Sequence, residues 1–256
     1  MTRRLIAALA CRNDGSRLFG KPLQQVSNGV TILDQIIAGI RTCREIDGIV
    51  LGVSEGTVNE VFAGVARAHG IGHIVGDSRD VLARLIQCGR AAGATDVFRV
   101  TTECPWFAYD LVSDAWRRHL ANGNDITVTD ELPEGLNFEI YTLEALERAH
   151  FRGTDRDRSE FCSNYPRTHP EEFKTEVLLP AEGLRRLDLR VTVDQPQDLI
   201  LARAIAAEFS RQMPRVMPHR IVEFLDRRLD LRTLVQPFVD PKPVWGMIAN
   251  RSEAPR

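Results

Sequence analysis

The chain has 256 residues, 43% of them hydrophobic, which is enough for one large domain with a sizeable core. Its 33 lysines and arginines nearly balance its 35 aspartates and glutamates, so its net charge predicts binding neither to nucleic acid nor to an anionic membrane. No segment approaches the roughly 20 apolar residues of a membrane span, and the apolar run after the basic start is too short for a signal peptide. Any anion site must therefore be built locally.

The five cysteines are scattered, without the close pairing of a zinc site or a disulfide scaffold. An odd number of widely spaced cysteines indicates free, reduced thiols, so we predict a cytoplasmic protein. Cys104 follows a predicted strand, but no triad spacing supports a nucleophile there. We interpret Cys104 as a small buried hydrophobic residue.

Short β-rich runs alternate with amphipathic helical stretches through the first two thirds of the chain, which predicts a mostly parallel sheet covered by helices. We predict strands over residues 5–11, 49–53, 73–75, 96–101 and 126–129. Thr31 and Asp34 resemble a capping box that opens the first helix. We predict further helices over residues 58–69, 81–92, 111–120 and 143–150.

The alternation stops at residues 151–169, which are polar and rich in Arg and Asp. We predict that residues 151–180 form an excursion over the site or a dimerisation element. Two extended runs, 173–179 and 187–193, and two helices, 197–209 and 220–229, follow. The Pro-rich end from residue 237 is predicted to be an arm or a disordered tail. The chain therefore divides into one domain over residues 1–235 and a C-terminal arm over 236–256.

The loop after the first strand, residues 12–22, is the strongest candidate site, because ligands of open α/β sheets bind beyond the carboxyl ends of the strands. It contains three cations, two glycines and a serine, which are Arg12, Arg17, Lys21, Gly15, Gly20 and Ser16. This composition suits a triphosphate, since glycines allow close backbone approach and cations neutralise phosphate oxygens. A solvated basic turn is the alternative interpretation.

Two carboxylates also follow predicted strands. Glu103 comes after the strand at 96–101, and Asp194 comes after the extended run at 187–193. Carboxylates at strand ends are well placed to hold Mg²⁺, so we predict these two as metal ligands. For Asp194, a plain helix cap is the alternative.

Candidates for the nucleoside pocket lie on the same rim. Asn13 and Asp14 qualify by their position in the first loop, together with Gly15. Ser54 and Asp77 end the second and third strands, and helix capping is an equally good explanation for both.

The first loop resembles the signature of the cytidylyltransferases that activate acidic sugars. These are the CMP-sialic acid and CMP-KDO synthetases and, especially, the spore-coat polysaccharide and flagellar-glycan branch. The resemblance runs in order over residues 5–205. It is carried by Arg12…Ser16-Arg17-Leu18-Phe19-Gly20-Lys21-Pro22, Asp80-Val81-Leu82, Arg99-Val100-Thr101 with Glu103-Cys104-Pro105, Gly135-Leu136 with Glu139, His169-Pro170, and Val193-Asp194 with Pro196.

This resemblance implies an α/β, Rossmann-like nucleotide-diphospho-sugar transferase fold, with a central mixed, mostly parallel sheet flanked by helices, in a homodimer. It implies transfer of CMP from CTP to a sugar acid in surface glycan biosynthesis, with release of pyrophosphate. Arg12, Arg17 and Lys21 would bind the triphosphate and stabilise the leaving pyrophosphate. Glu103 and Asp194 would hold Mg²⁺. The matched motif around Gly135 adds Asn137 and Glu139 as substrate-binding positions.

The sequence also departs from the family. Glu103 stands where the family carries Asp, Asn137 replaces the Asp of a Gly-Leu-Asp motif, and Phe161 falls where the spore-coat branch has His. These departures leave open a catalytically reduced nucleotide-binding homologue, another nucleotide, or a phosphate or phosphonate acceptor. A glycosyltransferase is a further alternative, because Asp155-Arg156-Asp157 has the Asp-x-Asp form, although no predicted strand precedes it.

Overall fold

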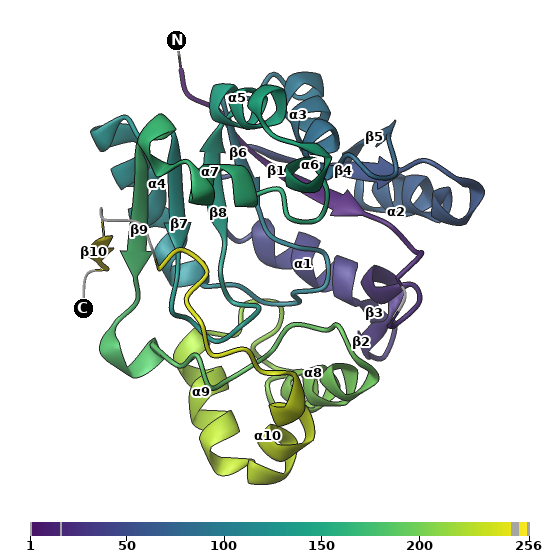
Figure 1. Ribbon diagram of the computed structural model, residues 1–256. Helices are drawn as coiled ribbons and strands as arrows, with labels where there is room; N and C mark the ends of the chain where they lie inside the picture. Colours follow the sequence, from purple (N-terminus) through teal and green to yellow (C-terminus); the bar gives the residue numbers. More distant parts are fainter. Residues whose placement is uncertain (1, 16, 247–250, 255–256) are drawn as a thin grey trace.

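The computed structural model describes residues 2–15, 17–246 and 251–254. Its centre is an eight-stranded sheet of order β10-β9-β7-β8-β6-β1-β4-β5 (Figure 1). The strands are β1 Leu5–Cys11, β4 Gly48–Ser54, β5 Gly72–Gly76, β6 Asp96–Arg99, β7 Ile126–Thr129, β8 Glu139–Thr142, β9 Thr175–Leu179 and β10 Arg251–Glu253. β8 pairs antiparallel with β6 and β7, and the other pairings are parallel. The predicted mixed, mostly parallel α/β sheet is confirmed.

Helices cover both faces of this sheet (Figure 1). They are α1 Ile32–Ile40, α2 Val61–His69, α3 Val81–Ala91, α4 Val112–Asn122, α5 Leu143–Arg152, α6 Asp155–Arg158, α7 Asn164–Thr168, α8 Pro196–Glu208, α9 Pro218–Arg227 and α10 Leu229–Val235. Thr31 and Asp34 form the predicted capping box at the start of α1, and Asp80 caps α3 by accepting the backbone N–H of Ala83 at 2.7 Å.

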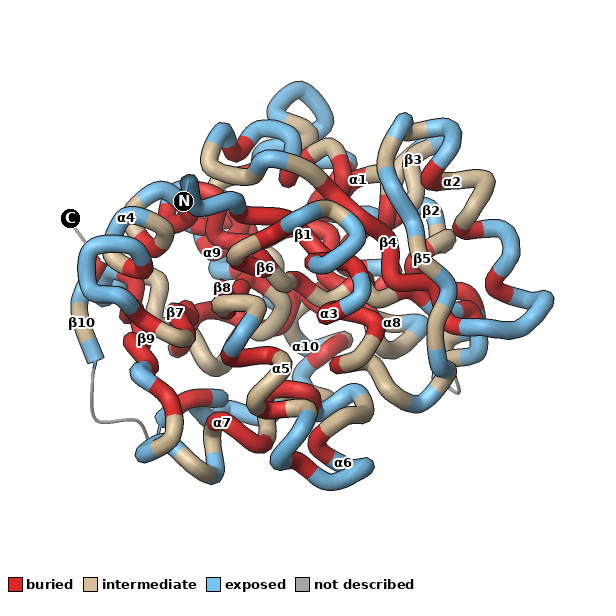
Figure 2. The backbone as a smooth tube through the Cα atoms, turned by 90° about the horizontal axis from the view of Figure 1, so that it is seen from above, coloured by how far each residue is buried: buried red, intermediate tan, exposed pale blue. Residues whose placement is uncertain are grey.

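The side chains of β1 point alternately into two hydrophobic cores, because successive side chains of a strand point to opposite faces of the sheet. Leu5 and Leu9 pack into a core with α1, α4, α8 and α9. Ile6 and Ala8 pack into a second core with α3 and α5. Seen from above, the buried strands run through the middle of the molecule, and exposed residues gather on the outer turns (Figure 2). The central strands of the sheet are therefore buried on both faces, as is typical of a mostly parallel sheet, while the edge strands β5 and β10 are more exposed.

One predicted strand is wrong. Residues 187–193 join no strand, and Arg190 forms only an isolated bridge with Glu134. The side chains of Leu189, Val191 and Val193 pack into the first core, although their backbone pairs with no strand of the sheet. This alternating burial explains why the sequence predicted a strand. Conversely, the short strand β8, the hairpin of β2 Gln25–Ser27 and β3 Val30–Thr31, and α10 were missed.

The C-terminal arm packs on its own chain, so the alternative of a disordered tail is wrong for the described part. Asp130, which is 1% exposed, accepts the backbone N–H groups of Val244 at 3.0 Å and Trp245 at 2.8 Å. The Trp245 side chain is buried in the second core, and β10 extends the sheet beside β9. No helix among the described residues is long and apolar enough to cross a membrane.

Asp130→Ala should loosen the arm, because the backbone N–H groups of Val244 and of buried Trp245 lose their acceptor, at a cost of about 1–3 kcal/mol. Hydrogen exchange should show faster exchange at Val244 and Trp245, with no change in β1. Asp240→Ala is the matched control, since within the described part of the chain its exposed carboxylate pairs only with exposed Lys242 on the same arm. Unchanged protection at residues 244–245 in Asp130→Ala would contradict this anchoring role.

Candidate active site

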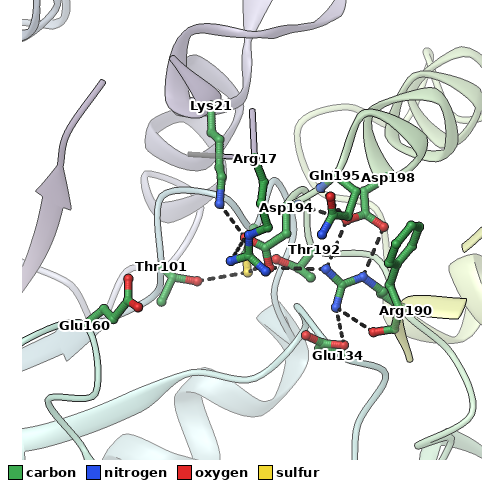
Figure 3. A network of polar contacts seen from close by, with 12 residues as sticks. Arg17, Lys21, Thr101, Glu134, Glu160, Arg190, Thr192, Asp194, Gln195 and Asp198 are labelled. Carbon is green, nitrogen blue, oxygen red and sulfur yellow. Dashed lines mark hydrogen bonds and ion pairs between the residues drawn. The ribbon is translucent and has the colours of Figure 1, made fainter. Parts of the chain in front are cut away.

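The first loop is folded back on itself at the carboxyl end of β1. The backbone N–H of Gly20 donates to the carbonyl of Asn13 at 2.8 Å, and Gly20 has a φ of 61°, which favours glycine. A Cβ on Gly15 would lie 2.6 Å from the carbonyl oxygen of Leu18, so a side chain there would collide with the loop backbone. This closure brings Arg17 and Lys21 to the same side of the loop as Asp194 (Figure 3). Ser16 lies outside the described residues.

Asn13 has a structural role in this loop. Its backbone N–H donates to Asn59 at 2.8 Å, and its side-chain amide donates to the carbonyl of Val58 at 2.6 Å. Its buried Oδ1 atom has no partner among the described residues. Contact between Asn13 and a base or ribose therefore stays a prediction, carried by that one free acceptor atom.

Asp194 is the carboxylate that contacts the cations of the site (Figure 3). Its Oδ1 atom accepts a short hydrogen bond from Lys21 and lies 3.4 Å from a guanidinium nitrogen of Arg17. Its Oδ2 atom lies 3.2 Å from Arg190. Burial alone would raise the pKa of Asp194, but the hydrogen bond from Lys21 and the three nearby cations lower it below its usual value. Asp194 is therefore a carboxylate held in its charged form.

Glu103 lies beside this carboxylate, because the backbone N–H of Val193 donates to the Glu103 carbonyl at 2.9 Å. Burial, and then the charge of Asp194, raise the pKa of the Glu103 carboxyl above its usual value. The described residues provide its side chain with no hydrogen bond or ion pair, and they contain no cluster of three or more metal-ligating side chains. Two adjacent carboxylates, one without a partner, suit Mg²⁺, which commonly takes one or two protein carboxylates together with substrate phosphates.

Arg190 is the functional residue that the sequence interpretation missed. It is 5% exposed, and it pairs in a two-pronged contact with Asp198, with both N···O distances 3.0 Å, as well as with Glu134 at 2.6 Å. Asp198 also accepts the backbone N–H of Asp194 at 2.9 Å. Arg190, Asp194 and Asp198 recur at a spacing of four, which is the only sequence signal that could have indicated this network. Arg190 therefore orients Asp194.

A cavity of about 220 Å³ opens beside Glu103 and Asp194, and Asn137 and Glu139 also line it. The wall of this cavity requires glycine at position 135, because a Cβ on Gly135 would lie 2.5 Å from the backbone nitrogen of Thr192. Glu139 pairs with Arg99 at 2.5 Å and accepts from the Tyr141 hydroxyl at 3.0 Å. The structure therefore brings both substrate-binding predictions to the cavity that contains the two carboxylates.

Cys104 lines the same cavity but is not ionised. Burial, and then the charge of Glu103, raise the pKa of its thiol to about 12. A neutral thiol is a poor nucleophile, and the buried position agrees with its interpretation as a small hydrophobic residue.

A second cavity, of about 760 Å³, opens beside the first loop, with Arg12, Asp14 and Asp77 in its lining. The Asp77 carboxylate accepts the backbone N–H groups of Arg79 at 2.7 Å and Asp80 at 2.9 Å, so it stabilises its own turn. Ser54 is buried and lines neither of these two cavities. The structure thus brings Asp77 to the rim and leaves Ser54 below it.

No family model matches the chain. Two known proteins are similar to it along most of its length. An uncharacterized protein of Methanocaldococcus jannaschii is 23% identical over 231 residues, which are 90% of this chain and 94% of that protein. The spore coat polysaccharide biosynthesis protein SpsF of Bacillus subtilis is 21% identical over 234 residues, which are 90% of this chain and 97% of SpsF.

Solved structures share the fold. A cytidylyltransferase from Leptospira borgpetersenii serovar Hardjo-bovis has a TM-score of 0.75 at 18% identity, over 92% of this chain and 97% of its own. CMP:2-keto-3-deoxy-manno-octonic acid synthetase, solved in complex with CTP, has a TM-score of 0.61 at 13% identity, over 80% of this chain and 99% of its own. The chain therefore shares the fold of these nucleotidyltransferases. The resemblance to the cytidylyltransferase family is confirmed, with SpsF among its relatives.

Glu103→Gln should stabilise the metal-free protein. Because the pKa of Glu103 is raised on folding, the native chain holds this proton more tightly than the unfolded chain. The stability that Glu103 contributes is therefore present below its unfolded pKa and falls as the pH rises through its native pKa. At neutral pH, removing its charge should raise the melting temperature by about 2–4 °C, the shift expected for roughly 1 kcal/mol in a domain of this size.

Thermal melts in EDTA and in Mg²⁺ with CTP test this expectation. Glu103→Gln should melt higher than wild type in EDTA and gain less from Mg²⁺ and CTP. Glu182→Gln, at an exposed position, is the control for loss of one negative charge. A lower melting temperature in EDTA would contradict the proposed repulsion between Glu103 and Asp194.

Proposed function

We propose that the chain is a Mg²⁺-dependent cytidylyltransferase that transfers CMP from CTP to a sugar acid and releases pyrophosphate, in surface glycan biosynthesis. The observation that carries the proposal is the contact of Lys21 and Arg17 with Asp194, next to Glu103. Phosphate-binding cations and metal-binding carboxylates thereby meet at one point. The similarity to SpsF and to a synthetase solved with CTP supports the choice of nucleotide and pathway.

The transfer requires positioning and charge neutralisation more than covalent catalysis. Arg12, Arg17 and Lys21 would bind the phosphates of CTP and neutralise the charge that builds up on the leaving pyrophosphate. Glu103 and Asp194 would hold Mg²⁺, which supplies neutralisation and polarisation of the reacting phosphate. Arg190 keeps Asp194 in place for this role, because the Arg190 guanidinium is itself fixed by Asp198 and Glu134.

The acceptor would occupy the cavity of about 220 Å³ beside the two carboxylates. Asn137 offers a buried Oδ1 atom without a partner among the described residues, which could accept a hydrogen bond from an acceptor hydroxyl. Arg99 is the cation of this cavity, and its pairing with Glu139 makes it available only in part to an acceptor carboxylate. A phosphate- or phosphonate-bearing acceptor and another nucleoside triphosphate are the nearest alternatives.

A catalytically reduced homologue is the second candidate, and the longer Glu103 arm and Asn137 favour it. Against it stand the intact cations of the first loop and their contact with Asp194. The glycosyltransferase alternative loses support, because Asp157 accepts from Thr154 and Asn164 within its own segment, while Asp155 is fully exposed. We also propose a cytoplasmic homodimer, which size-exclusion chromatography with light scattering would test.

Arg17→Ala should reduce pyrophosphate release from CTP by about a hundredfold or more, because one charge-assisted contact to the leaving phosphates is lost. Lys21→Ala should have at least the same effect, since Lys21 is the more buried cation and also positions Asp194. The assay would follow pyrophosphate with a panel of sugar acids and Mg²⁺.

Lys242→Ala is the control, because Lys242 is exposed and forms an ion pair with Asp240 alone among the residues that the structure describes. Circular dichroism would verify that each variant is folded. Undiminished pyrophosphate release in Arg17→Ala and Lys21→Ala would contradict the assignment of the first loop to the triphosphate.

A further inference from the structure

The larger cavity, of about 760 Å³, has a second wall that the proposed function does not explain. One wall is the first loop, through Arg12 and Asp14, and another is the segment 155–160, which includes α6. Four arginines from three separate segments line this cavity, which are Arg12, Arg79, Arg156 and Arg158. Five carboxylates also line it, which are Asp14, Asp77, Asp80, Asp155 and Glu160. The guanidinium groups can therefore bind a polyanionic ligand only where these carboxylates leave them unpaired.

The two walls come within ion-pair distance of each other. A guanidinium nitrogen of Arg12 lies 2.9 Å from the carboxylate of Glu160, although the two residues are 148 positions apart in the chain. A phosphate held by Arg12 would take the place of that carboxylate. It would then lie close to α6, which ends two residues before Glu160 at Arg158.

The arginines of α6 are only weakly neutralised by the protein. The nearest described carboxylate to Arg158 is Asp155, at 3.9 Å, and Arg156 lies over the ring of Phe161 at 5.7 Å from its centroid. In the first loop, by contrast, Arg12 is paired with Glu160, while Arg17 and Lys21 share Asp194. Among the described residues, Arg79 has no carboxylate within ion-pair distance either, so the cations of this cavity with unused capacity for an anion are Arg79 and the two arginines of α6.

The base of α6 is fixed in position. Thr154 and Asp157 form a capping box, and Arg158 donates through Nε to the carbonyl of His150 at 2.9 Å. His150 in turn contacts Asp80, the cap of α3, at 2.7 Å. These contacts hold α6 beside α3 and α5 (Figure 1). The two arginines are thus presented from a supported element rather than from a free loop.

We propose that Arg156 and Arg158 are further phosphate-binding residues, so that the nucleoside triphosphate is held between the first loop and α6. This inference rests on the proposed function and assigns α6 a role in binding CTP. In this account Glu160 occupies Arg12 until the triphosphate replaces it.

Calorimetric titration with CTP and with inorganic tripolyphosphate tests the proposal on four proteins. These are the wild type, Arg156→Gln, Arg158→Gln and Arg152→Gln. Arg152 is a matched control, because it ends α5 just before α6, pairs with Glu172 at 2.9 Å and does not line the cavity. We expect Arg158→Gln to weaken both ligands about tenfold or more, and Arg156→Gln to weaken both by a smaller factor, with Arg152→Gln unchanged.

The outcomes separate this inference from the proposed function. If the wild type binds CTP and both Arg156→Gln and Arg158→Gln bind it with undiminished affinity, the role of α6 is overturned. The proposed function then still stands. Loss of affinity for CTP alone, with tripolyphosphate unchanged, also overturns phosphate binding by α6. Wild type that binds neither CTP nor tripolyphosphate removes the proposed function and this inference together. If Arg158→Gln is unstable, Arg156→Gln still tests the proposal. Arg156 is exposed and its described contact is with the exposed ring of Phe161, so this substitution should leave the fold intact.

Discussion

The buried pairing of Arg190 with Asp198 is the interaction on which the site depends. Asp198 is inaccessible to solvent, so its charge requires the guanidinium of Arg190, and removing one partner of such a pair costs about 3–5 kcal/mol. The same guanidinium reaches Asp194 and Glu134, and Asp194 in turn holds Lys21 and Arg17. One buried ion pair therefore connects the C-terminal half of the domain to a loop more than 150 residues earlier in the chain.

This arrangement stores electrostatic repulsion at the point where a ligand would relieve it. Glu103 lies beside Asp194, and partial burial together with the charge of Asp194 raises the pKa of Glu103. A divalent cation would neutralise both carboxylates, while phosphates would attract Lys21 and Arg17. Functional sites commonly carry such a stability cost, because groups arranged for a ligand are not arranged for the empty protein. On this account, metal and triphosphate bind cooperatively because each removes charge that the other leaves unpaired.

Local sequence signals predicted much of the fold. The capping box of Thr31 and Asp34 and the buried run of β1 depend on neighbouring residues, so they could be predicted directly. The apolar alternation of residues 187–193 was misleading, because a core can bury such a run without hydrogen-bonding it into a sheet. The network of Arg190, the anchoring of Trp245 by Asp130 and the approach of Glu160 to Arg12 join residues far apart in the chain. Their partners become visible only once the topology is known, although the first loop and both carboxylates were predicted from composition, position and family resemblance.

The most direct test of the account is calorimetric titration of CTP, with and without Mg²⁺, into wild type and Asp194→Asn. This variant keeps the Arg190–Asp198 pair while removing the charge that Lys21, Arg17 and the metal are expected to share. The account predicts that Mg²⁺ strengthens CTP binding to the wild type and that this gain is largely lost in Asp194→Asn. An equal gain from Mg²⁺ in both proteins would contradict the role of Asp194 as the link between the nucleotide loop and the metal.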